Sequence, residues 1–123
     1  MYYVFFSYEI SLNLILILSR LIAPQYQGTY PLPFVCITAE FGYIIRVDFR
    51  DYFEMEPSDN CENDFLEIRD GAHGYSDLMG RYCGNTFPPI ITSQDRYLWL
   101  RFRSDETLEY KGFRAVYEFI MQG

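Results

Sequence analysis

Lysine and histidine are almost absent from this sequence, and their scarcity excludes several functions. Its 123 residues contain a single lysine, Lys111, and a single histidine, His73. Acidic residues outnumber basic ones by 17 to 10, and the formal net charge of −7 argues against the clustered basic surface that nucleic-acid phosphates require. Because the histidine lies in a glycine-rich turn and no nucleophile motif is present, we expect no enzyme and no small-molecule substrate.

Cysteine is scarce as well, and its three positions contain no metal-binding pair. Cys36, Cys61 and Cys83 are far apart in the sequence, and one histidine cannot complete a cluster around Zn²⁺, so a structural zinc site is excluded. In an oxidising compartment two of the three could pair. The remaining cysteine would then indicate a missing partner, an intermolecular bond or a free thiol.

No hydrophobic run is long enough to predict a membrane span. The most apolar stretch, Ile10–Leu18, is shorter than the roughly 20 residues that a span requires, and Arg20 interrupts its continuation. The residues before it contain Glu9 and no basic residue, unlike the start of a signal peptide. Residues 1–23 therefore have three interpretations, namely a poor signal peptide, a buried first strand, or sequence foreign to the domain that follows.

Aromatic residues are abundant, and the segments that contain them alternate between apolar and polar positions. Tyrosine, phenylalanine and tryptophan make up 20% of the chain, a composition that favours β-strands. The two-residue period of a strand with one buried face occurs in residues 43–49, 64–69, 97–103 and 113–119. No window has the period of a helix. Turn residues separate these segments, and together they predict an all-β antiparallel sandwich.

The same alternation predicts which side chains face the core. Leu66 is expected to point inward and its neighbour Glu67 outward. Trp99 lies on the face opposite Leu98, where it could be an exposed interface anchor. We expect instead that Trp99 is buried against a second sheet.

Four motifs then occur in a familiar order along the chain. They are PQYQGTYP at 24–31, CENDFLEIRDG at 61–71, YCG at 82–84 and SDETLEYKGF at 104–113. As a set they resemble the CUB domain family over roughly residues 22–120. The resemblance implies a CUB-type, jelly-roll-like antiparallel β-sandwich at residues 24–120. It leaves open whether all N-terminal strands of the family are present or some are missing. An apolar segment, 1–23, would precede it and a tail, 121–123, would follow.

A narrower similarity concerns the first CUB domain of neuropilin and tolloid-like proteins. It rests on the segments 55–58, 69–76, 88–90 and 104–109. Those proteins are auxiliary subunits of ionotropic glutamate receptors, so the similarity implies a fragment of such a subunit. It would lie on the cell surface or the secreted side, anchored through regions absent here. The alternatives are a CUB module of another secreted or developmental protein, or a non-functional truncated fragment.

The family resemblance also assigns the cysteines. Cys61 and Cys83 match the third and fourth cysteines of the family, which form a disulfide. Cys36 matches the second, but no cysteine precedes it in this chain. Cys36 is therefore expected to be unpaired. Either the N-terminus is not native to the domain, or the chain keeps a free, buried thiol.

Three carboxylates form the candidate metal site. Glu56, Asp64 and Asp105 match the acidic residues that ligate Ca²⁺ in many CUB domains, and Ca²⁺ prefers such oxygen ligands. The resemblance implies that Tyr26 packs beside them and that the Glu106 carbonyl completes the protein ligands. The same carboxylates and Tyr26 are expected to bind a protein partner that presents Lys or Arg. The alternative interpretation is that these acids are ordinary solvated surface residues.

Overall fold

The computed structural model describes residues 4–11, 34–103 and 111–122 of the chain, and eight strands and one short 3-10 turn account for most of them. The elements are β1 (Val4–Ser11), β2 (Phe34–Thr38), β3 (Tyr43–Glu54), η1 (Asp59–Cys61), β4 (Phe65–Asp70), β5 (Asp77–Tyr82), β6 (Ile91–Thr92), β7 (Tyr97–Arg103) and β8 (Gly112–Met121). Within these residues no helix is long and apolar enough to cross a membrane.

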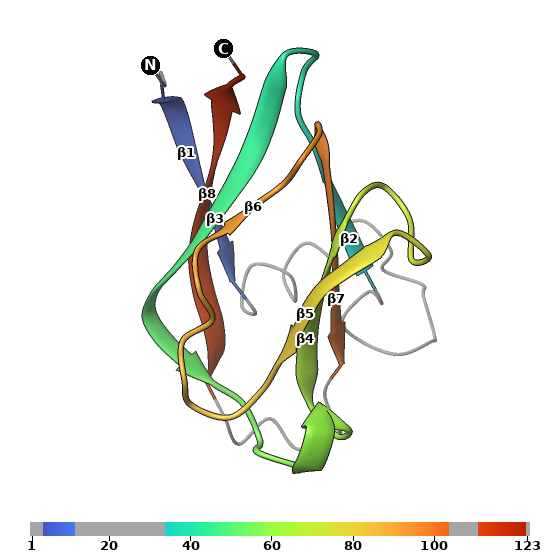
Figure 1. The fold of residues 1–123 in the computed structure, drawn as a ribbon. Coiled ribbons are helices and arrows are strands. Elements are labelled where there is room, and N and C mark those ends of the chain that lie inside the picture. The colour runs from blue at the N-terminus through green and yellow to red at the C-terminus, as the bar shows by residue number, and fades with distance from the viewer. Residues whose placement is uncertain (1–3, 12–33, 104–110, 123) are drawn as a thin grey trace, which may run out of the picture.

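The strands form two four-stranded sheets that face each other (Figure 1). Their strand orders are β1-β8-β3-β6 and β2-β7-β4-β5, and every pairing is antiparallel. This arrangement confirms the predicted all-β antiparallel sandwich. The four strands predicted from alternation are β3, β4, β7 and β8, which occupy the central positions of the two sheets.

The core consists of the inward positions of these central strands. Ile45 and Val47 of β3, Ile68 of β4 and Leu98 of β7 are completely buried, as their alternation predicts. Phe113 of β8 is also fully buried. Burial of each such side chain stabilises the fold by about 1.5–3 kcal/mol relative to exposure, so the two inner faces hold the sheets together.

β1 lies inside the N-terminal segment, for which the sequence left three interpretations. It pairs with β8, with Val4 opposite Ile120 and Ser11 opposite Arg114, and so forms the edge of its sheet. Ile10 is buried there. Residues 12–23 lie outside the described part of the chain, so the boundary at residue 23 stays a prediction.

Trp99 is buried as expected, but the expected cause was wrong. It lies on the outer face of its sheet, not between the sheets. Its ring stacks on Phe34 with the centroids 5.5 Å apart. The β4–β5 turn covers it from another side, since a Cβ added to Gly74 would lie only 3.3 Å from its Cζ2 atom. A turn folded over the sheet therefore shields a side chain that the second sheet cannot reach.

Cys36 is free, as predicted, and its side chain is exposed, so the alternative of a buried thiol is wrong. It occupies an outward position of β2, between Val35 and Ile37, of which Ile37 is buried. The two-residue period of the strand therefore turns Cys36 away from the core.

Candidate functional site

The loop between β3 and β4 is fastened to the end of β5 by covalent and hydrogen bonds. The predicted disulfide is present, joining Cys61 to Cys83 with their Cα atoms 5.6 Å apart. The backbone N–H of Met55 donates a hydrogen bond of 2.9 Å to the carbonyl of Gly84. The loop is also closed on itself, because the Asn63 N–H donates to the Ser58 hydroxyl at 3.2 Å. These links hold in place the segment that contains two of the predicted ligands.

Glu56 and Asp64 begin and end this fastened segment. Asp64 immediately precedes β4 and is 4% exposed, and the Oε2 atom of Glu56 is buried. Buried carboxylates are uncommon on an acidic protein, whose carboxylates normally lie in solvent. The interpretation of Asp64 as an ordinary solvated acid is therefore not supported.

The remaining predicted site residues, Asp105, Glu106 and Tyr26, lie outside the described residues. Within the described ranges, no group of three or more His, Cys, Asp or Glu residues is arranged to hold a metal ion. Only two of the three predicted ligands, Glu56 and Asp64, belong to those ranges. Asp64 and the buried oxygen of Glu56 are hard anionic donors of the kind that Ca²⁺ prefers, so the described part of the set fits this ion.

The pairing of β4 with β7 determines where the chain leaves toward Asp105. Phe65, the first residue of β4, pairs with Arg103, the last residue of β7. The chain therefore leaves β7 beside Asp64, two residues before Asp105. In Figure 1 the end of β7, the start of β4 and the end of β3 all lie toward the lower end of the sandwich.

An open groove of about 450 Å³, which no sequence pattern indicated, is lined by Met55 and Pro57, the two chain neighbours of Glu56. It runs between the end of β3 and the loop after β5, and its walls include Tyr52, Glu54, Met55, Pro57, Asn85 and Phe87. The ring of Phe87 is exposed. A groove with apolar walls and a carboxylate is suited to a side chain with an aliphatic stem and a basic end, such as Lys or Arg.

A second polar cluster lies on the outer face of the other sheet, around Glu67. Glu67 points outward as predicted, yet it is only 2% exposed because arginines cover it. Its carboxylate accepts hydrogen bonds from Arg69 at 3.2 Å and Arg81 at 2.7 Å. Burial alone would raise the pKa of Glu67, but the hydrogen bonds and charges of Arg81 and Arg69 lower it below the ordinary value. Glu67 is therefore a buried, ionised centre for the surrounding arginines.

Comparisons with known proteins agree with this architecture. The sequence model of the CUB domain matches residues 18–117. Human neuropilin and tolloid-like protein 2 is 45% identical over 101 residues, which cover 80% of this chain and 19% of that protein. Mouse neuropilin and tolloid-like protein 1 is 40% identical over 100 residues, covering 79% of this chain and 19% of that protein. The chain thus spans about a fifth of the length of these relatives.

Among solved structures, the MASP-1 CUB2 domain bound to Ca²⁺ is similar to this chain. Its TM-score is 0.64 at 28% sequence identity, and the match covers 90% of each chain. Sequence, topology and the Cys61–Cys83 disulfide thus give the same assignment. The chain belongs to the CUB domain family.

Proposed function

We propose that this CUB domain is an extracellular protein-binding module that depends on Ca²⁺, held by Glu56, Asp64 and Asp105. The observation that carries the proposal is the burial of Asp64 at the point where β7 ends, two residues before Asp105. Asp64 is thus a buried carboxylate beside the exit of the strand that leads to a second carboxylate. The Ca²⁺-bound MASP-1 CUB2 domain, with 28% sequence identity, supports the choice of ion.

Each residue of the site has a distinct part in this proposal. Asp64 and the buried oxygen of Glu56 supply anionic ligands from the fastened β3–β4 loop, Asp105 supplies one after β7, and the Glu106 carbonyl completes the set. When bound, the ion supplies the positive charge that offsets the repulsion among three gathered carboxylates. Tyr26 would pack beside this set.

The proposed partner presents a Lys or Arg side chain. Carboxylate oxygens that face outward from the site accept charge-assisted hydrogen bonds from such a cation. The groove lined by Tyr52, Glu54 and Phe87 would hold the aliphatic stem. The similarity to neuropilin and tolloid-like proteins extends the proposal to an ionotropic glutamate receptor as the partner, with this chain on the cell surface or the secreted side.

Thermal unfolding with and without Ca²⁺ tests the metal site. At a Ca²⁺ concentration of about ten times Kd, binding to the folded state alone stabilises it by about 1.4 kcal/mol. For a domain of this size the midpoint is expected to rise by about 5 °C. Asp64→Asn and Asp105→Asn are expected to abolish the rise, because each removes an anionic ligand.

Asp77→Asn is the matched control. Asp77 is exposed and begins β5, at the end of that strand away from Cys83, so this variant should keep the full Ca²⁺ response. An unchanged midpoint in the parent chain would refute Ca²⁺ binding. Such a result would favour the alternative of a non-functional fragment.

A further inference from the structure

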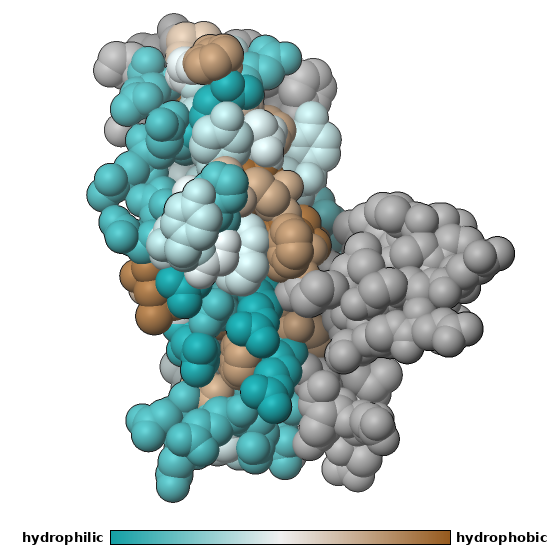
Figure 2. All heavy atoms as spheres, turned by 90° about the vertical axis from the view of Figure 1, so that its right-hand side faces the viewer, coloured by the Kyte–Doolittle hydropathy of each residue, from teal (hydrophilic) through white to brown (hydrophobic). Residues whose placement is uncertain are grey.

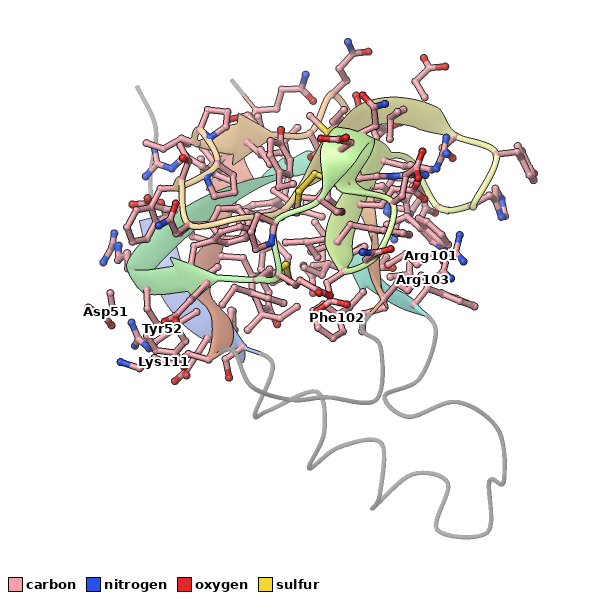
Figure 3. All side chains as sticks on the ribbon, turned by 90° about the horizontal axis from the view of Figure 1, so that it is seen from below. Asp51, Tyr52, Arg101, Phe102, Arg103 and Lys111 are labelled. Carbon is pink, nitrogen blue, oxygen red and sulfur yellow. A yellow bond between two sulfur atoms is a disulfide. The ribbon has the colours of Figure 1, made fainter. Side chains whose placement is uncertain are left out.

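Two arginines of β7 differ from most arginines of the described chain. Carboxylates neutralise Arg46, Arg50, Arg69, Arg81 and Arg114. Arg101 and Arg103 are exposed, and neither forms an ion pair with any residue in the described ranges. Figure 3 shows that both project outward from the sheet, whereas Phe102 between them points into the sandwich. Among the described residues, therefore, no carboxylate neutralises these two guanidinium groups.

The register of the sheet gathers these arginines around one aromatic ring. Arg103 pairs with Phe65, and Glu67 pairs with both Arg101 and Arg81. The guanidinium carbons of Arg81 and Arg101 lie 4.4 and 5.6 Å from the centroid of the Phe65 ring. Stacking on this ring holds the planar groups in place and leaves their N–H edges directed away from it.

The local charge of this face opposes the charge of the whole chain. The sheet register places Arg69, Arg81, Arg101 and Arg103 around Glu67, and these five described side chains together carry a formal charge of +3. The formal net charge of the chain is −7. In Figure 2, which views this side, strongly hydrophilic side chains gather on the lower part of the face.

The composition of the face favours a protein over a long polyanion. Phe34 pairs with Arg101, is half-exposed and stacks on Trp99. Arginine combined with tryptophan and other aromatic residues is typical of protein–protein interfaces. A long sulfated chain would extend past the patch over a protein whose formal net charge is −7, and the attraction of the arginines is screened beyond about 8 Å at physiological salt.

We propose that this arginine face, defined by Phe34, Phe65, Arg81, Arg101 and Arg103, docks an extended acidic segment of a partner protein. Alternate residues of a strand lie roughly 7 Å apart on one face. The Arg101 and Arg103 positions therefore match carboxylates at alternate positions of an extended segment, each of which an arginine can bind through two parallel hydrogen bonds. Phe65 and Arg103 directly follow or precede the segments that carry the proposed Ca²⁺ ligands Asp64 and Asp105, but the partner proposed for this face is acidic, whereas the partner proposed for the Ca²⁺ site is basic.

The direct test uses a fluorescent, N-acetylated and C-amidated peptide of alternating glutamate and threonine. Binding is measured by anisotropy in buffer that contains EDTA, so that failure of the proposed Ca²⁺ site does not affect the result. The Arg101→Gln/Arg103→Gln variant is expected to bind at least about tenfold more weakly than the parent, because it loses two charge-assisted contacts. Emission of Trp99, the sole tryptophan, should change on binding because the residue lies on this face.

The control variant Arg50→Gln/Lys111→Gln removes the same charge from exposed residues elsewhere, and its affinity should stay within about twofold of the parent. Melting of all variants in the same buffer verifies that they are folded. The proposal is overturned if the parent does not bind the peptide saturably, or if both variants lose affinity equally. Tighter, arginine-dependent binding of a heparin oligosaccharide would equally overturn the assignment of a protein partner.

Discussion

Removal of the Cys61–Cys83 disulfide is expected to lower the free energy of unfolding by about 3 kcal/mol. The bond closes a loop of 22 residues, and releasing such a loop increases the entropy of the unfolded chain by about this amount. The Cys61→Ala/Cys83→Ala variant, measured by urea unfolding, should therefore show a lower midpoint. Its Ca²⁺ affinity should fall too, because the bond fastens the loop that carries Glu56 and Asp64.

Cys36→Ser serves as the control for this experiment. Cys36 is exposed and free, so its replacement should change the unfolding free energy by less than about 0.5 kcal/mol. Equal stabilities of the disulfide variant and the parent would show that the β3–β4 loop is held by other contacts. The fastening of the proposed metal site would then need another explanation.

Glu67→Gln is expected to destabilise the fold by about 2 kcal/mol. The substitution keeps the shape of the side chain but leaves Arg69 and Arg81 without their shared carboxylate. Loss of one partner from a fully buried ion pair costs about 3–5 kcal/mol. The smaller value applies here because both arginines are partly exposed and can be rehydrated. Glu62→Gln, on an exposed loop residue, should have little effect on the same urea unfolding curve.

The pH dependence of Glu67→Gln follows from the lowered pKa of Glu67. Folding lowers the pKa of this carboxyl below its ordinary value of 4.5. The stabilisation that its charge gives to the folded state is therefore complete above pH 4.5 and is lost as the pH falls below that value. The stability difference between parent and variant should therefore be largest near neutral pH and shrink below about pH 5. A difference that stays constant down to acid unfolding would contradict the role of the charge.

The central strands of both sheets could be predicted from sequence because they have one buried face and strict alternation. Edge strands gave weaker signals. β6 has only two residues, and β5 has no fully buried position in its burial pattern. β2 contains the alternation Val35, Cys36, Ile37, but it is only five residues long. Short, partly exposed strands are defined by pairing partners far away in the sequence, which a local pattern cannot reveal.

The candidate site was predictable only in part for the same reason. Family motifs identified Glu56 and Asp64, whereas no motif indicated a role for Arg101 and Arg103. The sequence could not show that Arg81 lies across the sheet from Arg101, because β5 was not predicted and a register shift interrupts its pairing with β4. Burial of Glu67 likewise depends on the distant Arg81. The local strand pattern does not reveal this arginine, so Glu67 was expected to be solvated.

Calorimetric titration with Ca²⁺ tests the central claim most directly. The parent chain should bind one ion, and Glu56→Gln, Asp64→Asn and Asp105→Asn should each lower the affinity by at least about tenfold. Asp77→Asn should titrate like the parent. Binding of one ion that is lost in all three variants is the predicted result, whereas no heat of binding at any accessible Ca²⁺ concentration, together with no melting shift, would contradict the account.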